Sequence, residues 1–326
     1  MINSSAINGT CLLDETFLTI MMPPALTILF IFAASLYSLA LWTFCFHVKK
    51  KAPLNILMLN LCIRDLLFSL TYPIVITYYS NNNHWIFGNF MCKLQTFLIY
   101  FIILASIFFL TCICNYWCYM IVRPVHSQNR ITKKRAIVLR VLIWLLAGGL
   151  MSPSFSRISV FEMDGQLHCM SFNQPNVHKQ FHSSTIVLFL LSFVIPFVSL
   201  FVSTLLIHTK LANSTLTSQS QKGQRAIKMV IIVLCIFVIC FLPINAMHLT
   251  LSIVDRSNCK NQQHLGVLYY AGVLTLYLNN VLDPIVYFYA GTKYRAKFIS
   301  SIKGCTFCKS LPITISSTQS DRESKG

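Results

Sequence analysis

Long apolar runs alternate with short polar stretches along most of the chain. Seven of these runs are about 20 residues or longer, which is the length that a helix needs to cross the hydrocarbon core of a bilayer. They cover approximately residues 22–46, 54–79, 92–122, 136–155, 184–208, 226–254 and 265–290. The pattern predicts an all-α membrane protein built as a bundle of seven transmembrane helices.

The composition supports this prediction. Of the 326 residues, 55% are hydrophobic and 11% are charged, which is too apolar for a soluble domain of this length. The first residues, MINSSAINGT, show no basic segment followed by an apolar one, so no cleaved signal peptide is predicted.

The net charge is +17, from 26 Lys and Arg against 9 Asp and Glu, and in a soluble protein this excess would suggest nucleic-acid binding. Here the basic residues gather after spans one, three, five and seven. The other side of the membrane carries Lys93, Arg157, Lys179, Arg256 and Lys260. The positive-inside rule therefore predicts an extracellular N-terminus and a cytoplasmic C-terminus. Topology accounts for the charge, and no nucleic-acid partner is predicted.

These patterns divide the chain into an extracellular tail at 1–21, the bundle at 22–290, an amphipathic cytoplasmic helix at 291–304 and a disordered tail at 305–326. Asn3 and Asn8 lie in N-x-S/T sequons of the outer tail, which predicts glycosylation. Cys305 and Cys308 follow the amphipathic stretch. Because no second cysteine pair accompanies them, palmitoylation that holds the stretch on inner-leaflet lipids is favoured over metal binding.

Four cysteines fall on the predicted outer side, where thiols are oxidised: Cys92, Cys169, Cys11 and Cys259. A Cys92–Cys169 disulfide would pin the loop FEMDGQLHCMSFNQP over the third span, and a Cys11–Cys259 disulfide would join the tail to the last outer loop. Four unrelated cysteines are the alternative. The even number of outer cysteines favours the two pairs.

The stretch NNVLDPIVYFY, from Asn279 to Tyr289, interrupts the last apolar run with an acid, a proline and two amides. Charges are costly in lipid and proline removes a backbone donor, so these residues need partners on neighbouring helices. The stretch is therefore predicted to face the interior of the bundle.

Several motifs occur in a fixed order along the chain. They are LNLCIRDLLF with Asn60 and Asp65 in span two, HWIFGNFMC before span three, Trp144 in span four, Pro196 in span five, FVICFLP in span six, and Asp283, Pro284 and Tyr287 in span seven. Together they resemble the rhodopsin-like (class A) G-protein-coupled receptors over nearly the whole chain apart from the two tails. The stretches LALW, ASIFFLTCI and CFLP, Asp283 in place of asparagine, and the Cys11 and Cys259 pair further resemble the purinoceptor-like branch, which includes receptors for nucleotides and lysophospholipids.

The resemblance implies roles for buried residues. A mid-membrane pocket of Asp65, Ser106, Asn279 and Asp283 would hold a sodium ion as the chain's one cofactor, or form a protonated hydrogen-bonded network without an ion. Both alternatives stay open, because a buried carboxylate can be neutralised in either way. The activation switch implied by the family comprises Phe237, Phe241, Pro243, Pro284 and Tyr287.

For the ligand, the outer ends of the spans offer aromatic, basic and amide side chains: Tyr100, Arg157, Lys179, His182, Asn245, His248, Tyr269 and Tyr270. An anionic head group would need such cations and donors. Thr96 and Tyr269 occupy places where similar receptors often carry basic residues. A lipid-like ligand with one anionic group is therefore favoured over a nucleotide.

The chain departs from the family pattern at the inner end of the bundle. Tyr116, Trp117 and Cys118 stand where an acid, an arginine and a tyrosine are usual, and Tyr37 and Thr204 replace a usual asparagine and tyrosine. Val125 preserves an apolar position that similar receptors insert into a G protein. We therefore predict atypical coupling, with Trp117 and Val125 at the G-protein contact.

Arg64 precedes Asp65 in span two. Adjacent helical residues do not face each other, so the sequence predicts that Arg64 extends toward the inner membrane interface. A second hypothesis is that Arg64 partly replaces the arginine missing at Trp117.

The leading interpretation is a plasma-membrane receptor, not an enzyme, that binds an extracellular small molecule and signals through span six to a heterotrimeric G protein and arrestin. A non-signalling decoy or scavenger of the same fold is the alternative. A membrane enzyme or transporter is a remote alternative. A transporter would show internal repeats with paired broken helices, and the sequence shows none. A light-driven pump would need a lysine in the last span to hold retinal, and residues 265–290 contain none.

Overall fold

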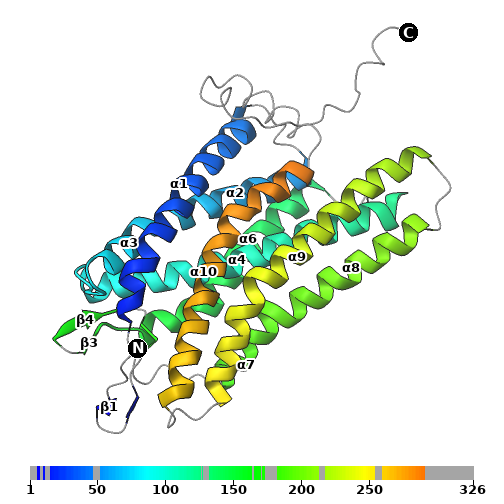
Figure 1. Cartoon of the computed structure of the whole chain (residues 1–326). Helices are drawn as coiled ribbons and strands as arrows, with labels where there is room; N and C mark the ends of the chain where they lie inside the picture. The colour runs from blue at the N-terminus through cyan, green and yellow to red at the C-terminus, as the bar shows by residue number, and fades with distance from the viewer. Residues whose placement is uncertain are drawn as a thin grey trace.

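The computed structural model describes residues 6–7, 10–11, 15–46, 52–125, 127, 132–163, 165–169, 171–172, 182–212, 217–253 and 259–290. These residues form a bundle of long helices with two small hairpins at one end (Figure 1). The helices are α1 (Thr16–Phe46), α2 (Pro53–Ser69), α3 (Tyr72–Ser80), α4 (Gly88–Val122), α6 (Lys133–Arg157), α7 (His182–Phe189), the π-helical turn η1 (Leu190–Val194), α8 (Ile195–Ala212), α9 (Thr217–Ile253) and α10 (Cys259–Ala290). The strands are β1 (Ala6–Ile7), β2 (Thr10–Cys11), β3 (Phe161–Met163) and β4 (Gln166–His168).

The prediction of seven membrane-spanning segments is confirmed, since seven helical segments of the described chain are long and apolar enough to cross a bilayer. α2 and α3 together make the second span, and α7, η1 and α8 make most of the fifth. α4 packs against α2, α6, α8 and α9 and is the central helix of the bundle. Large apolar side chains such as Ile28, Leu145 and Phe201 are exposed on outer faces, where lipid would cover them.

The second span is broken between α2 and α3, a feature that the sequence prediction lacked. Pro73, in the first turn of α3, has no backbone N–H and cannot continue the ladder. The carbonyl of Thr71 at the break accepts a hydrogen bond of 3.1 Å from the Gln95 amide of α4. The same carbonyl also accepts from the Val75 backbone N–H at 3.4 Å, so the side chain from the central helix adds a second donor at the break.

A disulfide joins Cys92, in the first turn of α4, to Cys169, which follows β4, and confirms the first predicted pair. β3 and β4 form an antiparallel hairpin beside this disulfide. The backbone N–H of Trp85 donates a 2.7 Å hydrogen bond to the Leu167 carbonyl, which also ties the hairpin to the loop before α4. We call this end of the bundle the disulfide end.

Several predictions fall on parts that the structure does not describe. The amphipathic helix at 291–304, the tail at 305–326, the sequons Asn3 and Asn8, and Cys305 and Cys308 lie outside the described residues. For the second cysteine pair, β2 ends at Cys11, α10 begins at Cys259, and β2 lies beside α10. The side chains of both cysteines are outside the description, so this disulfide stays a prediction.

Candidate ligand cavity and buried ion cluster

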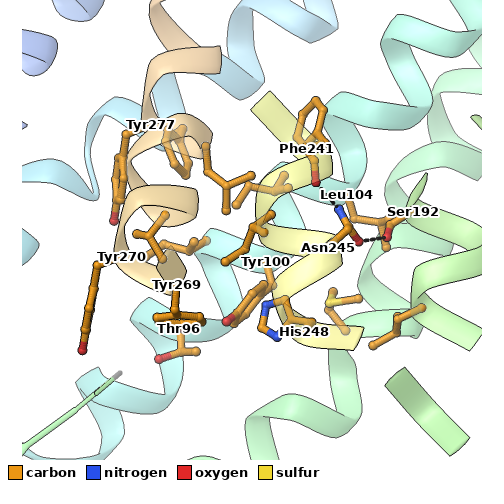
Figure 2. A pocket seen from close by; sticks show the side chains of 18 of the residues that line it. Thr96, Tyr100, Leu104, Ser192, Phe241, Asn245, His248, Tyr269, Tyr270 and Tyr277 are labelled. Atoms are coloured by element: carbon orange, nitrogen blue, oxygen red, sulfur yellow. Dashed lines mark hydrogen bonds between the residues drawn. The ribbon is translucent and has the colours of Figure 1, made fainter. Parts of the chain in front are cut away.

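A cavity of about 230 Å³ lies inside the bundle at the disulfide end. α4, η1, α9 and α10 contribute its walls, and Ser171 and Phe172, close to Cys169 in the chain, also line it. Most of the lining is apolar. Its polar members carry mainly hydroxyl groups: Tyr79, Thr96, Tyr100, Ser171, Ser192, Asn245, His248, Tyr269, Tyr270 and Tyr277. Figure 2 labels all of them except Tyr79 and Ser171. Among the lining residues that the structure describes, none is Lys, Arg, Asp or Glu.

The structure brings five of the predicted ligand residues together in this lining: Tyr100, Asn245, His248, Tyr269 and Tyr270. The His248 and Tyr269 rings meet edge to face with centroids 5.9 Å apart, and Tyr100 lies beside them in Figure 2. The side chains of Arg157, Lys179 and His182 lie outside the described part of the chain, so their predicted role stays untested.

Ser192 is a cavity residue that the sequence analysis missed. It lies four residues before Pro196, which cannot donate to the carbonyl of Ser192, and here the helix widens into the π-helical turn η1. The Ser192 hydroxyl donates a 3.0 Å hydrogen bond to the Asn245 side-chain oxygen (Figure 2), and the Asn245 amide donates to the Phe241 carbonyl at 2.8 Å. The fifth and sixth spans are therefore linked by a polar contact at the cavity wall.

Glu15 is a second residue that the sequence analysis missed. It precedes α1, is buried at 6% exposure, and its carboxylate accepts hydrogen bonds from Ser171 at 2.7 Å and Tyr270 at 2.8 Å. The Phe172 N–H in turn donates to the Tyr270 hydroxyl at 3.0 Å. An acidic side chain from the N-terminal segment therefore engages two donors of the cavity lining.

The predicted mid-membrane network is present, with Arg64 at its centre. We call Arg64, Asp65, Ser106, Asn279 and Asp283 the ion cluster; all five are buried. The guanidinium lies 2.8 Å from Asp65 and 2.5 Å from Asp283, and it donates a hydrogen bond to the Ser106 hydroxyl. The Asn279 amide donates to Asp283 at 3.1 Å.

The prediction that Arg64 extends toward the inner interface is therefore wrong. A charge inside a bundle is most stable when paired, and two carboxyl groups and a hydroxyl lie within reach of Arg64. The expectation that neighbours on one helix cannot pair also fails, because the long arginine side chain folds back onto Asp65. The second hypothesis, a partial replacement of the arginine missing at Trp117, concerns signalling and stays a prediction, but the two sites are well apart. Ser106, a partner of Arg64, precedes Trp117 on α4 by about 16 Å of helix rise.

The ion cluster does not fit a sodium ion. One oxygen each of Asp65, Ser106 and Asp283 already contacts the guanidinium, whose positive charge would repel a metal ion at the same place. Of the two alternatives drawn from the sequence, the hydrogen-bonded network matches the geometry, with an arginine added to it.

Of the predicted switch residues, Phe241 lines the cavity and Phe237 packs against Phe241. The two rings, both buried, have centroids 5.2 Å apart. Pro243 lies inside α9 and Pro284 inside α10, each interrupting the hydrogen-bond ladder of its helix. The side chain of Tyr287 is outside the described part.

At the opposite end of the bundle, the departures from the family pattern make few polar contacts. The Trp117 indole N–H is buried and has no hydrogen-bond partner among the described residues, and Thr204 bonds to the Leu200 carbonyl of its own helix. Val125 is 77% exposed. The polar link between α4 and α8 comes instead from Asn115, which accepts hydrogen bonds from Ser199 and Ser203 at 3.1 and 2.8 Å.

A seven-helix membrane bundle with a disulfide-pinned hairpin, an internal cavity and a proline-bearing helix in its wall defines a seven-transmembrane receptor. The chain belongs to the 7 transmembrane receptor (rhodopsin family), which matches residues 38–287. It is 29% identical to human hydroxycarboxylic acid receptor 3 over 300 residues, covering 90% of this chain and 76% of that receptor. It is 31% identical to a human purinoceptor over 300 residues, covering 88% of this chain and 79% of that receptor. These relatives confirm a receptor of the purinoceptor-like branch and not an enzyme.

Proposed function

We propose that this protein is a plasma-membrane receptor, with its N-terminus outside the cell, that binds an extracellular small molecule in the cavity and signals through movement of α9. The observation that carries the proposal is the place of Phe241. It lines the cavity, packs against Phe237 and precedes Pro243 by less than one helical turn. A ligand in the cavity would therefore press on the part of α9 where bending costs least.

The lining favours a lipid-like ligand with one small polar or anionic group. Its described residues are aliphatic, aromatic or hydroxyl-bearing, with one amide and one histidine, and none is Lys or Arg. Binding a nucleoside triphosphate requires several charge-assisted hydrogen bonds, whereas binding a single carboxylate or hydroxyl group requires few. One relative is named a hydroxycarboxylic acid receptor and another a purinoceptor. We propose that Arg157, Lys179 and His182 meet the anionic group at the cavity mouth.

The test is a signalling assay on cells that display the full-length receptor. The probes are long-chain hydroxy acids and single-chain lysophospholipids, with ATP and ADP as the nucleotide arm. Activation by the lipid probes at lower concentrations than by nucleotides supports the proposal. A response confined to nucleotides would contradict the ligand class while leaving the receptor function intact.

The Ser192–Asn245 contact gives a first mutational prediction. Asn245→Ala is expected to weaken the potency of an activating lipid about tenfold, because a hydrogen-bonding group at the cavity wall contributes about 1.4 kcal/mol. Agonist concentration–response curves measure this change. Ser152→Ala is the control, since Ser152 is exposed on α6 and bonds to the Gly149 carbonyl of its own helix. Equal potencies for both variants would show that Asn245 does not contact the ligand.

The inner end of the bundle favours atypical coupling to heterotrimeric G proteins and arrestin. The buried Trp117 indole offers no charge where similar receptors carry an arginine, yet the exposed Val125 keeps an apolar contact. A non-signalling decoy is the second candidate, supported by the same lack of polar contacts at Trp117 and Thr204.

Trp117→Arg separates these two candidates. In an atypically coupled receptor, the added guanidinium is expected to raise agonist-stimulated G-protein activation about fivefold or more, the scale of a typical coupling energy. G-protein activation and arrestin recruitment are measured at matched surface expression, with Trp117→Phe as the control that changes the same position without adding a charge. Silence of both the wild type and Trp117→Arg, despite ligand uptake, would favour the decoy.

A further inference from the structure

One buried guanidinium connects three helices in the middle of the bundle. Arg64 lies on α2 and is 1% exposed. Its Nη1 lies 2.8 Å from Oδ1 of Asp65 on the same helix, and its Nη2 lies 2.5 Å from Oδ2 of Asp283 on α10. Nη2 also donates to the Ser106 hydroxyl on α4. The guanidinium thus contacts every carboxyl group of the ion cluster.

The charges of the cluster account for this arrangement. Two carboxyl groups with no exposure to water would be very costly as anions unless a cation or a proton compensates them. One guanidinium, together with one proton retained on the two carboxyl groups, leaves the cluster with no net charge. A metal ion in the same place would have to displace the guanidinium from its oxygens and would meet like-charge repulsion from it.

We propose that Arg64 is the resident cation of this cluster, that it takes the place of a dissociable metal ion, and that the stability of the receptor is therefore insensitive to sodium. A cation covalently attached to α2 cannot leave the site. The link between α2, α4 and α10 then depends on the side chains alone and not on the ionic composition outside the cell. The proposal does not depend on the ligand class or on coupling.

The experiment compares melting curves of the purified full-length receptor in NaCl and in KCl at equal ionic strength, so that general salt effects cancel. The wild type is expected to melt at the same temperature in both salts. Arg64→Ala removes the guanidinium and leaves two carboxyl groups around the freed space. This variant is expected to melt lower in KCl and to gain a saturable rise, on the order of a few degrees, with NaCl.

Arg64→Ala combined with Asp283→Asn is the matched control. It removes one of the two anions that would bind the metal, so the sodium-dependent rise should disappear. If Arg64→Ala does not yield folded protein, Arg64→Lys replaces it, because an ammonium keeps a cation at the site and should melt alike in both salts.

Two results would overturn the proposal. The first is a saturable sodium-specific stabilisation of the wild type that Asp65→Asn abolishes, since a metal ion would then share the site with Arg64. The second is a folded Arg64→Ala that responds to neither salt, since the guanidinium would then not occupy a place that a cation can fill. Sodium-specific stabilisation of Arg64→Lys would have the same meaning as the first result.

Discussion

Replacing Asp283 by alanine is expected to lower the free energy of unfolding of the bundle by about 3–5 kcal/mol, because it breaks a buried ion pair that links two helices. Asp283 is 0% exposed and lies 2.5 Å from the Arg64 guanidinium on another helix. Without it, the guanidinium keeps Asp65 and Ser106 but loses its contact with α10. The measurements are the melting temperature of purified receptor and the amount of receptor at the cell surface.

Two further variants separate charge from shape at this site. Asp283→Asn keeps the volume and one acceptor oxygen, so its loss should be smaller than that of Asp283→Ala. Asn279→Ala removes one neutral donor, which bonds Asp283 at 3.1 Å, and should cost about 1 kcal/mol. Equal losses for Asp283→Ala and Asn279→Ala would show that the ion pair contributes no more than a neutral hydrogen bond.

The seven spans could be predicted because a bilayer imposes a minimum apolar length, which a single sequence displays directly. The ends of the spans were harder to predict from the sequence. α1 begins at Thr16, earlier than the predicted start at 22, because the helix continues through Pro23 and Pro24. At the break between α2 and α3, the Gln95 amide of α4 donates to the Thr71 carbonyl. A contact of this kind comes from another helix and leaves no local pattern.

Part of the cavity lining could be predicted from its position along the spans. Asn245, His248 and Tyr269 were identified by their position near the outer ends of spans, and they do line the cavity. Ser192 was missed because its place in the wall follows from the π-helical turn next to Pro196. Glu15 was missed because an isolated acid before the first span gives no sign that Ser171 and Tyr270 will bind it.

Arg64 shows where local rules fail. The prediction weighed its neighbour Asp65 and its distance from the interface, both of which are visible in the sequence. The outcome was decided by Ser106 and Asp283, which lie 42 and 219 residues away along the chain. A charged residue in a span is therefore best assigned only after every buried acid of the bundle has been considered as its partner.

Replacing Cys169 by alanine is expected to lower the free energy of unfolding by about 2–4 kcal/mol and to weaken ligand binding in the cavity. The disulfide closes a loop of 77 residues between Cys92 and Cys169. The stabilisation should lie toward the lower end of the range, because α4 and α6 remain as inserted helices after tertiary contacts are lost. The loop is then less free than in an unfolded soluble chain.

Ligand binding should suffer more than stability, because Ser171 and Phe172 lie two and three residues after Cys169 and line the cavity. Released from α4, this segment would also loosen its contacts with Glu15 and Tyr270. Melting temperature and agonist potency are measured for Cys169→Ala, and for the wild type with and without a reducing agent. Cys235→Ala, which removes an exposed free thiol on α9, is the control and should change neither quantity. If Cys169→Ala lowers the melting temperature but leaves potency unchanged, the segment after β4 does not hold the ligand, and the cavity walls on α4, α9 and α10 suffice.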